Sequence, residues 1–188
     1  MKNFKIIALV AFSVILLTSC SKDDNNTPVN EEEVITTVRV TLEGLSETIV
    51  LESRDADGDG PLAPVLTPVG GGALAANTTY LGTVEFLNEL VTPAADITEE
   101  VFAEGVDHQV FFQLPAAVGT VAYDDLDTNG KPVGLDFTLT TGATVGSGNF
   151  TVTLIHLPNK SGVGVSSGDI TNAGGNTDAA VTFQVSGL

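Results

Sequence analysis

Polar and apolar residues alternate in short runs along most of this chain, and a two-residue period is typical of β-strands with one buried face. The clearest run is 34–42, in which every second residue falls on one face: Val34, Thr36, Val38, Val40 and Leu42. Similar runs occur at 47–53, 79–90, 108–114, 119–125, 133–141, 149–157 and 179–187. About eight short strands separated by turn signals predict an all-β fold, an antiparallel β-sandwich of the immunoglobulin-like kind.

Two segments between these runs have a different pattern. Residues 66–80 are rich in Gly, Pro and Ala, which predicts an irregular connection. Asp96 is followed three residues later by Glu99, and this spacing resembles a capping box. We therefore expect one short helix that begins at Asp96 and continues through Glu100.

The amino-terminal segment lacks the alternation. Lys2 and Lys5 precede an apolar run at 6–17, and small residues lead from it to Cys20. This order is that of a secretory signal peptide. The run is also shorter than the about 20 apolar residues that a membrane-spanning helix needs. We therefore expect residues 1–19 to form a signal helix that is cleaved.

The segment that follows, 20–33, is polar, acidic and interrupted by Pro28. Such a composition predicts a flexible tether. The alternating pattern starts directly after it, so we expect the β-sandwich domain to span 34–188. This length is sufficient for one domain with a substantial core.

Cys20 is the only cysteine in the chain, so no disulfide within the chain explains it. The sequence LTSC at 17–20 resembles the lipobox of bacterial lipoproteins. That resemblance implies cleavage before Cys20 and acylation of the cysteine, with palmitate among the possible acyl chains. Several chains would form a permanent anchor, because each buried methylene contributes about 0.8 kcal/mol.

The sequence SKDD at 21–24 resembles the surface-export signal of lipoproteins in Bacteroidota. The resemblance implies a protein on the outer face of the outer membrane. An ordinary solvated linker is the alternative for these four residues. Over its whole length the chain is similar to small outer-membrane lipoproteins of that group, many of which act beside TonB-dependent receptors or in surface attachment.

The charge of the chain narrows the classes of partner. The formal net charge is −17, and it becomes −19 when Lys2 and Lys5 leave with the signal. Such a field repels nucleic acid and attracts cations. A nucleic-acid-binding protein needs a basic surface, which this composition does not supply.

Two acidic loops are candidate calcium sites. The first carries Asp55, Asp57 and Asp59 before Gly60, and the second carries Asp125, Asp127 and Asn129 before Gly130, with Asp136 at the twelfth place. Alternating carboxylates on a tight loop converge, and hard oxygen ligands suit Ca²⁺. The second loop resembles the calcium loops of EF-hands and dockerins, although it has Asp rather than Glu at the twelfth place.

Each loop also has a simpler interpretation. Asn129 and Gly130 between two strands form a strong hairpin signal. Asp136 alternates with apolar neighbours and would then only face water. The first loop has Leu66 at the twelfth place, so a calcium ion there would need a further ligand such as Glu52.

The two histidines, His108 and His156, each stand at the end of an apolar stripe. If their strands are neighbours, the pair could bind a transition metal with help from Glu104 or Asp107. The simpler interpretation is that both are hydrogen-bonded edge residues, because structural and catalytic sites use more than two ligands.

The sequence favours a non-enzymatic role. It has no GxSxG motif, and adjacent acidic residues on a strand point to opposite faces. We expect a lipid-anchored binding or accessory module with calcium-ordered loops. The alternatives are a structural or adhesive surface protein, or a metal-capture protein or hydrolase that uses His108 and His156. An exposed aromatic platform would favour a sugar or peptide ligand, whereas a pocket with a histidine and a carboxylate would favour metal capture or catalysis.

Overall fold

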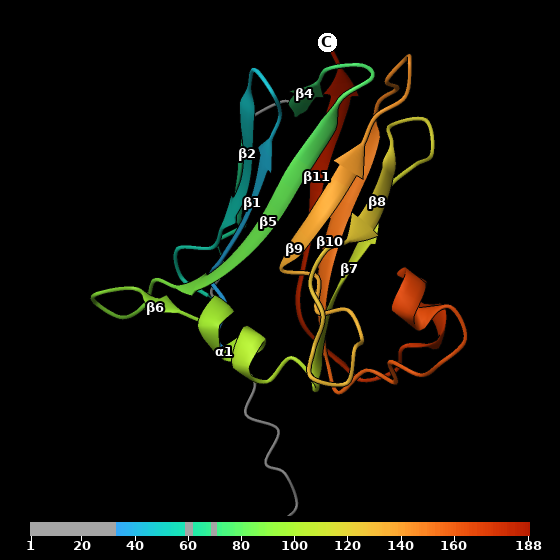
Figure 1. The fold of residues 1–188 in the computed structure, drawn as a ribbon. Coiled ribbons are helices and arrows are strands. Elements are labelled where there is room, and N and C mark those ends of the chain that lie inside the picture. The colour runs from blue at the N-terminus through green and yellow to red at the C-terminus, as the bar shows by residue number, and fades with distance from the viewer. Residues whose placement is uncertain (1–32, 59–61, 69–70) are drawn as a thin grey trace, which may run out of the picture. The chain divides into compact units, whose positions relative to one another are not determined.

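A computed structural model describes residues 33–58, 62–68 and 71–188 (Figure 1). The predicted signal peptide, Cys20, the SKDD segment and Asp59 lie outside the described residues. Within the described part, no helix has both the length and the apolar character needed to cross a membrane.

The described chain forms two β-sheets. The larger one has the order β3-β2-β1-β5-β9-β8, with β6 paired to β5. Its strands are β1 (Thr37–Glu43), β2 (Thr48–Arg54), β3 (Val65–Thr67), β5 (Thr79–Asn88), β6 (Ala95–Asp96), β8 (Thr120–Tyr123) and β9 (Asp136–Thr140). The smaller sheet has the order β4-β11-β10-β7. It contains β4 (Gly72–Leu74), β7 (His108–Gln113), β10 (Gly148–His156) and β11 (Asn176–Gly187).

The predicted all-β sandwich is confirmed, because the apolar faces of the two sheets form one core. Val38, Val40 and Leu42 on β1 are buried, as their alternation predicts. Across the layers, the rings of Phe112 on β7 and Phe137 on β9 have centroids 4.3 Å apart. The two rings join the sheets, with Phe150 on β10 also in contact.

The segment 66–80, predicted to be irregular, instead contains all of β4 and parts of two other strands. β4 pairs in parallel with the end of β11, from Val185 to Gly187. Its first residue, Gly72, lies so close to β2 that a Cβ atom would approach the Leu51 side chain to 2.8 Å. The small residues that suggested irregularity therefore permit close packing between the sheets.

The short helix α1 (Thr98–Ala103) exists, but Asp96 is not its N-cap. Ile97 occupies that position, and it makes no side-chain cap. Asp96 belongs to β6 and pairs with Leu87, so its backbone is extended, and its Oδ1 accepts a hydrogen bond from the Thr98 N–H at 3.0 Å. Because Asp96 pairs with β5, the helix starts at Thr98 and not at Asp96 as predicted.

Two 3₁₀ turns complete the domain between β10 and β11. They are η1 (Val165–Ser167) and η2 (Ile170–Asn172). The loop that holds them folds back onto β7, where Gln109 Nε2 donates to the Val165 carbonyl at 2.9 Å. This loop also carries Lys160, and it lies at the same end of the sandwich as the start of β7 (Figure 1).

Candidate functional site

The two histidines come together at one end of the smaller sheet. β7 and β10 are neighbours, and their antiparallel register places His108 directly opposite His156. The two rings stack with centroids 4.7 Å apart and planes 15° from parallel. The condition under which the sequence predicts a shared site, that their strands be neighbours, is therefore met. His108 is fully buried and His156 is half-buried.

A β-bulge adds a carboxylate to this pair. In the pairing of β10 with β11, Leu154 faces Ala179 and Ile155 faces Thr177, so Asp178 is the extra residue. Bulges turn a side chain out of the regular alternation. Here Asp178 Oδ2 lies 3.7 Å from His108 Nε2, and the Asp178 side chain is only 2% exposed.

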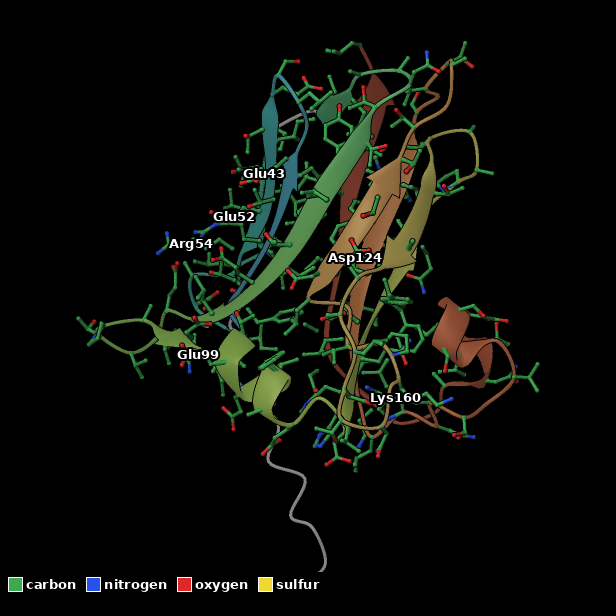
Figure 2. All side chains as sticks on the ribbon, in the orientation of Figure 1. Glu43, Glu52, Arg54, Glu99, Asp124 and Lys160 are labelled. Carbon is green, nitrogen blue, oxygen red and sulfur yellow. The ribbon has the colours of Figure 1, made fainter. Side chains whose placement is uncertain are left out.

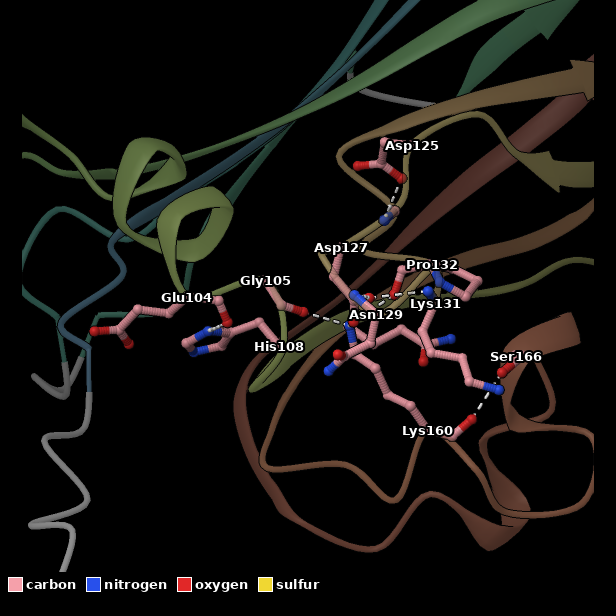
Figure 3. Close-up of polar contacts among 12 residues, drawn as sticks. Glu104, Gly105, His108, Asp125, Asp127, Asn129, Lys131, Pro132, Lys160 and Ser166 are labelled. Carbon is pink, nitrogen blue, oxygen red and sulfur yellow. Dashed lines mark hydrogen bonds and ion pairs between the residues drawn. The ribbon is translucent and has the colours of Figure 1, made fainter.

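Two glutamates approach His108 from other segments. Glu33, the first described residue, places Oε1 3.2 Å from His108 Nε2. The backbone carbonyl of Glu104 lies 3.2 Å from His108 Nδ1 (Figure 3). Among the described residues, two groups of three could hold a metal ion: His108, His156 and Asp178, and Glu33, Glu104 and His108. Of the two helpers predicted from sequence, Glu104 is in a group and Asp107 is in neither.

The electrostatics of His108 reflect these neighbours. Burial lowers its pKa because it disfavours the charged imidazolium. The contacts with Glu33, the Glu104 carbonyl and Asp178 act in the opposite direction and outweigh burial, so the pKa of His108 is raised. The cluster therefore favours a positive charge at its centre.

A polar pocket of about 540 Å³ adjoins the cluster. Its lining residues are Glu33, Val34, Ile35, Asp55, Gly58, Leu90, Thr177 and Asp178. Glu33 and Asp178 belong both to this pocket and to the histidine cluster. Asp55 brings a third carboxylate to the wall, so the approach to the cluster is acidic.

The first acidic loop contributes to that pocket through Asp55. Asp55 Oδ1 accepts a hydrogen bond from the Asp57 N–H at 3.2 Å, and Asp57 Oδ2 accepts one from the Leu62 N–H at 3.2 Å. Asp57 Oδ1 is buried and has no hydrogen-bond partner within the described part of the chain. Asp55 and Asp57 thus retain capacity for a cation, and calcium binding at this loop stays a prediction.

The second acidic loop uses its carboxylates internally. Asp125 accepts hydrogen bonds from the N–H groups of Gly134 at 2.6 Å and Leu135 at 2.8 Å, with Asp136 at 3.3 Å. Asp127 Oδ1 accepts from the N–H groups of Asn129 and Lys131 at 2.8 and 2.9 Å. Asp136 is exposed and belongs to neither metal-holding group. This geometry favours the hairpin interpretation of the loop.

A buried lysine pairs with one of the predicted calcium ligands of that loop. Lys160 is 7% exposed, and its Nζ lies 3.0 Å from Asp127 Oδ2. The same ammonium donates to the carbonyl of Pro132 at 2.8 Å and to the carbonyl of Gly105 (Figure 3). Burial raises the pKa of Asp127, but the Lys131 and Asn129 N–H groups and the Lys160 ammonium outweigh it, so the pKa is lowered.

Sequence reasoning missed both Asp178 and Lys160. Asp178 acquires its role from a bulge, which depends on how β10 and β11 pair. Lys160 stands in a loop without periodicity. The one available signal was its rarity, since the chain has only seven Lys and Arg residues in total.

The rest of the described surface offers no aromatic platform. Within the residues that the structure describes, Phe102 is the only exposed aromatic side chain. It borders a hollow of about 590 Å³ beside β5 and α1. A smaller hollow of about 270 Å³ lies between β8 and the η1 turn. The features expected of a sugar- or peptide-stacking surface are therefore not present in this part of the chain.

Comparison with family models, curated proteins and solved structures finds no match.

Proposed function

We propose that the chain is a lipid-anchored outer-membrane protein of the cell surface whose β-sandwich acts as a non-enzymatic binding or accessory module. The observation that carries this proposal is Cys20 at the end of a signal-like segment, followed by an acidic tether. The described chain begins at one end of the sandwich, and its carboxyl terminus lies at the other end (Figure 1).

The proposal includes a protein partner in the same membrane. A TonB-dependent receptor is the partner that the resemblance implies, and nucleic acid is excluded by the charge. A structural or adhesive role is the alternative. The acidic pocket beside His108, His156 and Asp178 supports binding over a purely structural role, because it places carboxylates on the wall of a hollow that a cationic ligand could enter.

Membrane fractionation tests the anchor. The Cys20→Ala variant should leave the membrane fraction or accumulate as an uncleaved precursor. Protease added to intact cells should remove the wild-type domain, and replacement of Lys22, Asp23 and Asp24 by alanine should protect it. A Cys20→Ala protein that fractionates and migrates as wild type contradicts the anchor, and equal protection of both tether forms contradicts surface exposure.

A further inference from the structure

We propose that His108, His156 and Asp178 form a binding site for a divalent transition metal of the zinc type, with Glu33 as the fourth ligand. The potential ligand atoms of His108, His156 and Asp178 are two ring nitrogens and a carboxylate oxygen, and they lie within 4.8 Å of one another. Two imidazoles with carboxylates are the donor set that zinc and its neighbours accept. The inference goes beyond the proposed surface role and does not depend on the lipid anchor.

The orientation of His108 is the first argument. Its Nδ1 faces the Glu104 carbonyl at 3.2 Å, and a carbonyl can only accept a hydrogen bond, so Nδ1 carries the proton. The free lone pair of a neutral ring is then on Nε2, which faces Glu33 and Asp178. A hydrogen bond from the far ring nitrogen to a carbonyl is how proteins orient histidines that bind metals.

The second argument is that a proton alone does not satisfy the cluster. A lone pair that faces two carboxylates needs a positive charge between them, and a proton on Nε2 could supply it. Even so, His156 Nδ1 and Glu33 Oε2 are buried without a hydrogen-bond partner among the residues that the structure describes. Buried polar atoms without partners lose their hydrogen bonds to water and destabilise the fold. One metal ion would give acceptor atoms of this kind a common partner.

The third argument is the placement of Asp178. In a regular strand, the Asp178 side chain would point to the face opposite to those of Thr177 and Ala179. The bulge interrupts this alternation, and Asp178 points toward His108. The bulge weakens the pairing of β11 with β10 at this point, but it places the Asp178 carboxylate, which is 2% exposed, beside His108. The ligand atoms of the triad lie within 4.8 Å of one another. Neighbouring ligands of a tetrahedral zinc lie about 3.3 Å apart when the bonds are about 2.0 Å, so the side chains need to move only slightly to bind the metal.

Access and selectivity follow from the adjoining pocket. Glu33 and Asp178 line both the cluster and the pocket of about 540 Å³, so an ion can reach the site from there. Asp55 adds negative charge to the pocket wall. The two imidazoles select against calcium and magnesium, which prefer oxygen ligands.

Zinc titration of the purified full-length protein in detergent tests the site, with excess magnesium present to saturate oxygen-only sites. Calorimetry should show one zinc per chain. The His156→Gln and Asp178→Asn variants should each bind at least about tenfold more weakly. His156 is half-buried, so its variant is the one expected to retain the fold. The matched control for Asp178→Asn is Glu43→Gln, which also removes one negative charge and lies at the opposite end of the sandwich from Lys160 (Figure 2).

Cobalt gives a second readout that a structural role would not produce. Cobalt bound by two imidazoles and carboxylates in four-coordinate geometry should show intense visible absorption, which zinc should abolish and His156→Gln should lack. The Cys20→Ala variant must bind zinc as wild type does, which separates this site from the anchor. The proposal is overturned if wild type does not bind zinc stoichiometrically. It is also overturned if His156→Gln and Asp178→Asn bind zinc as tightly as wild type does.

Discussion

The ammonium of Lys160 lies 3.0 Å from the carboxylate of Asp127, and the two side chains are only 7% and 1% exposed. Lys160 comes from the loop after β10, whereas Asp127 belongs to the hairpin before β9. The pair therefore joins two segments that are far apart in the sequence. With the carbonyls of Gly105 and Pro132, Asp127 uses all three donors of the ammonium.

We predict that Lys160→Met lowers the free energy of unfolding by about 3–5 kcal/mol, because it leaves Asp127 buried without its counter-charge. The Lys160→Met/Asp127→Asn double variant should recover part of this loss. Urea denaturation measures both. Lys131→Met is the matched control, since its backbone N–H to Asp127 is retained. A loss below about 1 kcal/mol for Lys160→Met would contradict a structural role for the pair.

Calcium should stabilise the protein through the loop with Asp55 and Asp57, and not through the loop with Asp125 and Asp127. The latter carboxylates already accept N–H groups or contact Lys160, whereas Asp57 Oδ1 has no hydrogen-bond partner in the ranges that the structure describes. A ligand at about a hundred times its dissociation constant adds about 2.7 kcal/mol. For a domain of this size that raises the melting temperature by roughly 5–10 °C.

Thermal unfolding after chelator treatment, with and without millimolar calcium, measures this effect. Asp57→Asn should abolish the calcium-dependent rise in melting temperature. Asp127→Asn should show the same rise as wild type, but its melting temperature without calcium should be lower. Sodium chloride at matched ionic strength is needed because screening of a strongly negative chain also stabilises it. An equal shift with sodium, or a shift that persists in Asp57→Asn, would show that the loop is an ordinary turn.

Stability should decline in alkaline solution through the two tyrosines. Burial and the hydrogen bond from Tyr80 to Glu47 raise the pKa of Tyr80 to about 12, and burial raises the pKa of Tyr123 to about 12. In the unfolded chain both pKa values are about 10. The folded state thus holds protons that the unfolded state releases, so stability is full below pH about 10 and is lost as the pH rises toward 12.

The chain has two tyrosines and no tryptophan, so tyrosinate absorbance reports on these residues alone. A spectrophotometric titration should show ionisation near pH 12 in the folded protein and near pH 10 in denaturant. The Tyr80→Phe and Tyr123→Phe variants assign the two steps. Ionisation at the same pH in both solvents would mean that the tyrosines are not buried.

Gly82→Ala should be strongly destabilising although alanine fits a strand. Gly82 on β5 faces Phe137 on β9, and an added Cβ would lie 2.3 Å from the Phe137 ring. Overpacking of this kind costs about 1–3 kcal/mol. Gly142→Ala is the control, because its Cβ would find its nearest atom 3.7 Å away. Denaturant unfolding distinguishes the two, and equal stabilities would show that Phe137 moves aside without cost.

The fold was more accessible from the sequence than the site. Strands such as β1 were predictable because burial follows a two-residue period within one segment, as Val38, Val40 and Leu42 show. The meeting of His108 with His156 could be stated only as a condition, because it depends on which strands pair. Asp178 and Lys160 depend on a bulge and on a loop trajectory, which arise from contacts between distant segments and leave no periodic trace.

The position of β1 has a mechanical consequence. β1 starts shortly after Glu33 and lies inside its sheet, with β2 and β5 paired along all seven of its residues. Hydrogen bonds between antiparallel strands run perpendicular to the strands. A pull on the amino-terminal side along the strand therefore loads both rows of bonds in shear at once, instead of opening them singly. β1 should therefore resist a force that is applied at its amino-terminal end.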